Sequence, residues 1–97
     1  MKAVRDPQGA EARALVAALA LPGRRVLEIG CGSGQLTWQY AGLPRRVVGI
    51  DPDAAGLRQA KIDRPSPVEN VFMLQGVAEA LPFPSRVFDV VLFSSSF

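Results

Sequence analysis

The chain has 97 residues, of which 48% are hydrophobic and 21% charged, and its formal net charge is +2. These values are near globular averages, so they exclude a disordered chain, and the length allows one small domain. No apolar run approaches the ~18 residues of a membrane span, and the first eight residues lack the apolar core of a signal peptide. We therefore expect a cytoplasmic protein without a membrane partner.

The chain contains no histidine and one cysteine, Cys31. Mechanisms that use a histidine base or ligand are thereby excluded, as are an internal disulfide and a zinc-thiolate cluster, so we expect no metal site. The basic residues are scattered. The pairs Arg24-Arg25 and Arg45-Arg46 precede predicted strands and should lie at the amino edge of the sheet, so we expect no nucleic-acid partner.

The first 23 residues predict an N-terminal helix. Asp6 and Pro7 suit an N-cap and a first helical position. An alanine-rich stretch follows at residues 8–20, and Pro22-Gly23 ends it. The apolar face of this helix would consist of Ala14, Leu15, Ala18 and Leu19.

From residue 24 onward, short apolar runs alternate with helical patterns. We predict strands at 26–29, 47–50, 71–74 and 87–93, helices at 35–42 and 53–62, and a connection with a single helical turn at 76–84. Strands that alternate with helices imply parallel pairing with right-handed crossovers. The pattern predicts an α/β fold, a doubly wound Rossmann-like parallel sheet with strand order 3-2-1-4.

The predicted fourth strand is nearly all apolar. A bare apolar edge invites pairing with another chain. We therefore expect further protein, a second copy or a partner chain to cover this edge.

The strongest chemical signal is the glycine-rich run EIGCGSG at residues 28–34, which follows a predicted strand and opens a predicted helix. Glycines permit a tight turn and the close approach of a ligand. A helix N-terminus offers N–H groups that suit a carboxylate or a phosphate. An ordinary glycine-rich turn has the same pattern, so the glycines alone leave both interpretations open.

Asp51 ends the second predicted strand, 21 residues after Gly30. A carboxylate about 20 residues after such a loop can accept hydrogen bonds from both hydroxyls of a ribose. The alternative is that Asp51, which Pro52 follows, only caps the next helix.

Three segments together resemble the class I S-adenosylmethionine-dependent methyltransferases. Residues 26–37 (VLEIGCGSGQLT) resemble the family's first motif, 48–52 (VGIDP) its second-strand motif, and 75–83 (QGVAEALPF) with 88–91 (FDVV) its third- and fourth-strand motifs. The pattern is similar to the small-molecule branch called type 11, which includes ubiquinone/menaquinone-type enzymes. The resemblance implies one incomplete domain over 1–97, with an N-terminal helix in 1–23 and a cofactor-binding half in 24–97 that lacks the C-terminal strands of the full fold.

The resemblance also implies S-adenosylmethionine as the cofactor. Glu28 would face the methionine amino end and Asp51 the ribose hydroxyls, while the backbone of Ala78 would bond the adenine edge. Many relatives carry an aspartate where this chain has Val77, so recognition of the adenine amino group would be weaker, or would fall to Glu79 or to a water. The residues implied at the cofactor site are Glu28, Gly30, Cys31, Gly32, Gly34, Ile50, Asp51, Pro52, Val77, Ala78, Glu79 and Leu81.

Three functions fit these signals. The first is methyl transfer to a small-molecule acceptor, with no catalytic residue identified, because orientation alone supplies about 7–11 kcal/mol of barrier reduction. The second is a non-catalytic, truncated cofactor-binding module that pairs through its exposed fourth strand. The third is an NAD-binding Rossmann domain, which the spacing disfavours, since Gln35 stands where G-x-G-x-x-G requires its third glycine.

Two further signals have plain interpretations. Cys31 lies by a predicted helix N-terminus, which can lower the pKa of a thiol, but the family often has a small residue there, so we expect no redox role. Ser94, Ser95 and Ser96 follow the fourth strand. No base is available to activate them, so we expect a polar strand end.

Overall fold

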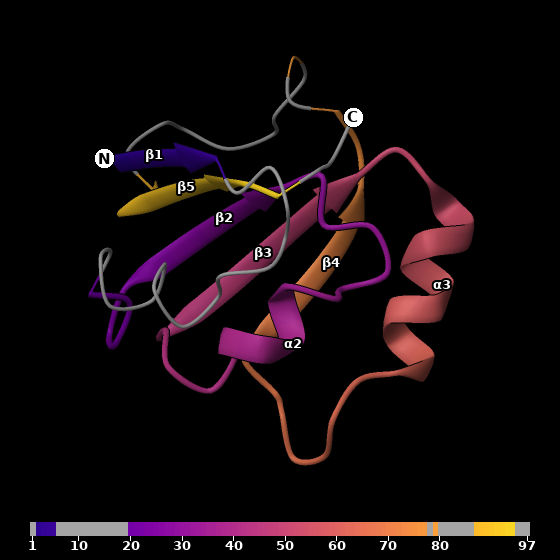
Figure 1. Ribbon diagram of the computed structural model, residues 1–97, viewed down its shortest axis with the longest axis horizontal. Coiled ribbons are helices and arrows are strands. Elements are labelled where there is room, and N and C mark those ends of the chain that lie inside the picture. The colour runs from indigo at the N-terminus through magenta and orange to yellow at the C-terminus, as the bar shows by residue number, and fades with distance from the viewer. Residues whose placement is uncertain (1, 6–19, 78, 80–86, 95–97) are drawn as a thin grey trace.

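The computed structural model describes residues 2–5, 20–77, 79 and 87–94. Its strands form one parallel sheet with the order β1-β5-β2-β3-β4 (Figure 1). The described helices are α2 (Thr37–Tyr40) and α3 (Ala54–Ile62). The strands are β1 (Lys2–Arg5), β2 (Arg25–Ile29), β3 (Arg46–Asp51), β4 (Val71–Gln75) and β5 (Val90–Phe93).

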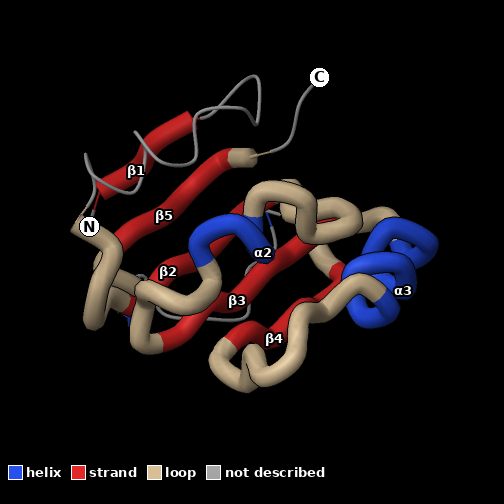
Figure 2. Tube along the Cα trace, turned by 60° about the horizontal axis from the view of Figure 1, so that its bottom comes forward, coloured by secondary structure: helices blue, strands red, loops and turns tan. Residues whose placement is uncertain are grey.

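The predicted strand order is confirmed. The four predicted strands correspond to β2, β3, β4 and β5, and their order in space, β4-β3-β2-β5, is 3-2-1-4. Figure 2 shows that α2 crosses β2 and β3, whereas α3 lies beside β3 and β4. The predicted helix at 8–20 falls almost entirely on residues outside the described part of the chain, as does most of the predicted turn at 76–84.

The sequence led us to expect that further protein, a second copy or a partner chain covers the fourth strand, whereas the structure pairs this strand with the N-terminus of the same chain. The N-terminal strand β1 runs parallel to β5, with Lys2 opposite Val90 and Arg5 opposite Phe93. On its other side β5 pairs with β2. This edge of β5 is therefore paired within the chain.

Two elements differ from the prediction by more than one residue at a boundary. The helix predicted at 35–42 is α-helical only over Thr37–Tyr40, with turns on either side. The fourth strand begins at Val90 rather than at 87. Asp89 explains the second difference, because its carboxylate accepts from the backbone N–H of Arg25 at 2.8 Å and from the guanidinium at 3.1 Å, which holds the chain in a turn before pairing starts.

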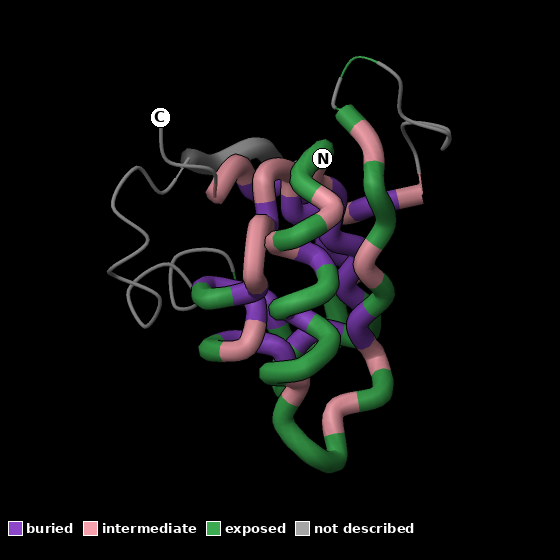
Figure 3. Tube along the Cα trace, turned by 90° about the vertical axis from the view of Figure 1, so that its right-hand side faces the viewer, coloured by how far each residue is buried: buried purple, intermediate pink, exposed green. Residues whose placement is uncertain are grey.

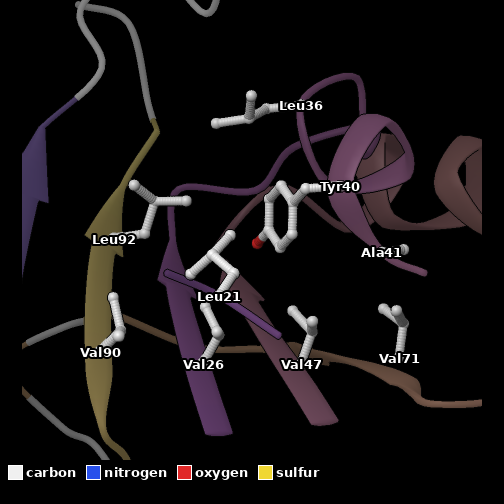
Figure 4. Close-up of a cluster of buried hydrophobic side chains, with 9 residues drawn as sticks. All are labelled: Leu21, Val26, Leu36, Tyr40, Ala41, Val47, Val71, Val90 and Leu92. Atoms are coloured by element: carbon white, nitrogen blue, oxygen red, sulfur yellow. The ribbon is translucent and has the colours of Figure 1, made fainter. Parts of the chain in front are cut away.

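Side chains pack on both faces of the sheet, as the non-alternating apolar strands predicted. In β2, Val26 points to the face that α2 covers and Leu27 to the opposite face. Buried residues therefore follow the strands through the centre of the molecule (Figure 3). The cluster under α2 consists of Leu21, Val26, Leu36, Tyr40, Ala41, Val47, Val71, Val90 and Leu92 (Figure 4). Among the described residues, no helix has the length and apolarity to cross a membrane.

The Arg25–Asp89 pair makes stability depend on pH. Hydrogen bonds from the Arg25 side chain, and then from its backbone N–H, lower the pKa of Asp89 from 3.8 to about 2. A lowered carboxyl pKa stabilises the fold above the unfolded value of about 4, and the effect is lost as the pH falls toward 2. Asp89→Asn should therefore lower the melting temperature at pH 7, and the difference from wild type should shrink between pH 4 and pH 3. A difference that stays constant from pH 7 to pH 3 would refute this linkage.

Candidate cofactor site

The glycine loop, defined as residues 30–34, turns at the carboxyl end of β2 and is hydrogen-bonded to β3. The Ile50 carbonyl accepts from the N–H of Gly30 at 2.7 Å and of Cys31 at 3.3 Å. Gly30, Gly32 and Gly34 have φ values of 82°, 54° and 83°. This left-handed backbone disfavours any side chain, so the three glycines are required for the shape of the turn.

Asp51 is joined directly to this loop. Its Oδ2 accepts from the Gly32 N–H at 2.9 Å, and its Oδ1 accepts from the Asp53 N–H at 2.8 Å. A carboxylate offers about four lone-pair positions, so each oxygen keeps one for another donor. The alternative that Asp51 caps the following helix is not what the structure shows, because the N-cap of α3 is Asp53, which accepts from Ala55 N–H at 3.0 Å.

The first turn of α3 packs against the glycine loop. A Cβ at Gly56 would lie 3.3 Å from the carbonyl carbon of Gly32 and 3.1 Å from Oδ2 of Asp53. Glycine costs about 1 kcal/mol in a helix interior. The close contact with the loop accounts for a glycine at this helical position.

Glu28 lies beneath the loop and is fully buried. Its Oε1 accepts from Thr37 Oγ1 at 2.8 Å and from the Tyr40 hydroxyl at 2.5 Å, and its Oε2 accepts from Ser94 Oγ at 2.5 Å. The Tyr40 oxygen points from α2 toward β2 (Figure 4). Burial, and then the charge of Glu28, raise the pKa of Tyr40 well above its usual value. The predicted contact of Glu28 with the methionine amino end stays a prediction. The observed bonds show that the carboxylate also links β2 to α2 and to the end of β5.

Cys31 contributes only its backbone to the outer surface of the loop. Its side chain is buried, with Sγ 3.5 Å from Sδ of Met73. Burial, and then the charges of Glu28 and Asp51, raise the pKa of the thiol to about 12. The thiol is therefore protonated at neutral pH, the opposite of an activated nucleophile.

Pro52 and Val77, which were predicted to lie near the adenine ring, follow the carboxyl ends of β3 and β4. Gly76 N–H donates to the Asp51 carbonyl at 3.1 Å, which brings Val77 beside the end of β3. Val77 and Glu79 are exposed, as is Pro52, whereas Ile50 is only 2% exposed and belongs to the core. Gln75 donates from Nε2 to the Pro52 carbonyl at 3.2 Å and so links the two strand ends. Ala78 and Leu81 lie outside the described residues.

Sequence reasoning missed the hydroxyl groups that serve the site. We expected a plain polar strand end at Ser94 and no site role for Tyr40, yet both hydroxyls donate to Glu28. The helical spacing of Thr37 and Tyr40 puts both on one face of α2, and this spacing was the available signal. Nothing local to Ser94 indicates its partner, which lies 66 residues away.

Comparisons with known proteins identify the family of the chain. Residues 26–97 match the family described as a methyltransferase domain. The chain is 41% identical over 70 residues to an uncharacterized methyltransferase of Synechocystis sp., covering 72% of this chain and 31% of that protein. It is 36% identical over 84 residues to the ubiquinone/menaquinone biosynthesis C-methyltransferase UbiE of Vibrio campbellii, covering 77% of this chain and 31% of that one.

A solved structure gives the same fold. The phosphoethanolamine N-methyltransferase 1 of Haemonchus contortus, crystallised with phosphoethanolamine and S-adenosylhomocysteine, superposes with a TM-score of 0.74 at 25% identity. The match covers 88% of this chain and 18% of that one. The chain thus spans less than a third of the length of these relatives. It belongs to the class I S-adenosylmethionine-dependent methyltransferases and corresponds to the N-terminal part of their fold.

Proposed function

We propose that the chain binds S-adenosylmethionine at the carboxyl ends of β2 and β3, as the cofactor half of an enzyme that methylates a small molecule. The observation that carries this proposal is the bond from the Gly32 N–H to Asp51 Oδ2. It places a carboxylate with unused acceptor positions beside a turn whose three glycines carry no side chains. Those are the groups that a ribose with two hydroxyls and a closely packed ligand chain require.

The residues present fit this cofactor. Asp51 has acceptor capacity for ribose hydroxyls, the glycine loop lets a ligand approach the backbone, and exposed Pro52 and Val77 offer apolar surface to an adenine ring. When bound, the sulfonium would supply a methyl group already activated for transfer. The work of this chain is to hold that group in line with an incoming nucleophile, and orientation of this kind is worth about 7–11 kcal/mol.

The relatives do not fix the acceptor, because their names cover small molecules as well as RNA: one is named a tRNA U34 carboxymethyltransferase. One matching protein is named for ubiquinone and menaquinone biosynthesis, and another was crystallised with phosphoethanolamine. The exposed arginines Arg24, Arg45 and Arg46 lie at the amino edge of the sheet, opposite the glycine loop. These three arginines therefore place no basic surface beside the glycine loop, which favours a small-molecule acceptor over nucleic acid in the proposal.

Calorimetric titration with S-adenosylhomocysteine tests the proposed function. Wild type should bind in a saturable way, and Asp51→Ala should weaken binding about 10- to 100-fold, since hydrogen bonds to a charged acceptor contribute about 1.5–3 kcal/mol. Asp63→Ala is the matched control, because Asp63 caps the opposite end of α3. A folded wild type that fails to bind, equal binding by Asp51→Ala, or a preference for NAD would each contradict the proposal.

A further inference from the structure

The Glu28 carboxylate of β2 is hydrogen-bonded to side chains from α2 and from the end of β5. Thr37 and Tyr40 reach it from α2, and Ser94 reaches it from the end of β5. Glu28 and Thr37 are 0% exposed and Tyr40 is 1% exposed. Because a buried carboxylate is stable only where donors satisfy it, the positions of these hydroxyls are set by the charge they surround.

Ser94 also contacts the glycine loop itself. Its Oγ lies 3.1 Å from the carbonyl oxygen of Gly30, and its backbone N–H donates to the carbonyl of Ile29 at 3.0 Å. A serine hydroxyl has one proton, so this proton is shared between the Gly30 carbonyl and Glu28 Oε2. Glu28 lies in β2 just before the glycine loop, and Gly30 is the first residue of the loop and has a positive φ.

The location of Ser94 gives these contacts a functional meaning. It follows β5, which pairs with β2 so that Phe93 lies opposite Ile29. Ser94 therefore stands beside Gly30 at the carboxyl edge of the sheet, where ligands of open parallel sheets bind. It connects the end of β5 to the peptide that the cofactor would approach.

We propose that Ser94 is a positioning residue, whose hydroxyl holds Glu28 and the Gly30 carbonyl and so fixes the glycine loop in its ligand-binding shape. It acts through the loop rather than by touching the reacting atoms. Its value for methyl transfer rests on the proposed function, whereas the effect on the loop stands on the contacts of the chain alone.

Hydrogen exchange of the ligand-free chain tests the effect on the loop. The N–H groups of Gly30, Gly32 and Gly34 are all hydrogen-bonded, so their exchange reports loop opening. Ser94→Ala should speed their exchange about fivefold, the factor that about 1 kcal/mol of lost hydrogen bond gives. Ser94→Thr keeps the hydroxyl and should restore most of the protection. Ser66→Ala, on the exposed loop before β4, should leave it unchanged.

A merely structural role would produce a different pattern. If Ser94→Ala lowered the melting temperature and sped exchange equally in α3 and in the loop, Ser94 would be an ordinary stabilising residue and the proposal would fail. Unchanged exchange at the three glycines would also overturn it. Because this readout needs no ligand, failure of wild type to bind S-adenosylhomocysteine would sink the proposed function without deciding the role of Ser94. If wild type does bind, Ser94→Ala should weaken the affinity by a similar factor, which Ser94→Thr should restore.

Discussion

Replacing Gly34 by alanine is expected to destabilise the chain by about 2–5 kcal/mol, since two costs of about 1–2 and 1–3 kcal/mol combine. The first cost is backbone strain, because Gly34 has a φ of 83°. The second is a collision, because a Cβ there would lie 2.6 Å from Nε1 of Trp38. Trp38 has little room to yield, since its ring packs against the core and the Arg64 guanidinium lies 5.4 Å from the ring centroid.

Three other glycines separate these two costs. Gly23 has a φ of 78° and open space, so Gly23→Ala should show strain alone. Gly49 has no such φ, but its Cβ would lie 2.6 Å from Sδ of Met73, so Gly49→Ala should show the packing cost alone. Gly42 has neither a positive φ nor a close neighbour, so the free energy of unfolding of Gly42→Ala should stay within about 0.5 kcal/mol of the wild-type value. Denaturant unfolding followed by the fluorescence of Trp38 measures all four variants. The account would be contradicted if Gly34→Ala were no less stable than Gly42→Ala.

Deleting residues 1–5 is expected to make the chain self-associate. In the structure β1 covers the outer edge of β5 along its whole length. Without β1, the apolar strand Val90–Phe93 would present unpaired N–H and C=O groups, which is a template for pairing with a second copy. Light scattering after gel filtration should show the mass of the truncated chain rising with concentration, more steeply than that of the 97-residue chain.

A variant of unchanged length serves as the control for this deletion. Replacing residues 2–5 by Gly-Ser-Gly-Ser keeps the chain length and lowers strand propensity, so it should shift the mass in the same direction by less. If the truncated chain kept the mass of the full chain at every concentration, β1 would not be what protects β5.

Local signals account for what the sequence predicted correctly. Short apolar runs ending in glycine or aspartate marked β2 and β3, and Asp53 ahead of an amphipathic stretch marked the start of α3. The sequence spacing between the glycine loop and Asp51 predicted that the two lie together, because neighbouring parallel strands bring their carboxyl ends to the same edge. The hydrogen bond from Gly32 to Asp51 confirms this contact.

What the sequence did not predict depends on contacts between distant residues. Lys2–Arg5 shows no strand pattern of its own, and it is a strand because Val90–Phe93 offers it a partner at the other end of the chain. The role of Tyr40 was hidden for another reason. Helical periodicity detects its apolar ring, but its hydroxyl matters only once Glu28 is known to be buried beneath α2.

If the carboxyl ends of β2 and β3 form the cofactor site, S-adenosylhomocysteine must perturb the backbone amides there. An NMR titration of the isotopically labelled chain measures this residue by residue. Saturable shifts are expected at Gly30, Gly32 and Asp51, with Gly42 at the opposite edge of the sheet unaffected. Shifts confined to the amino edge, or none at the glycine loop while the fold is intact, would contradict this placement of the site.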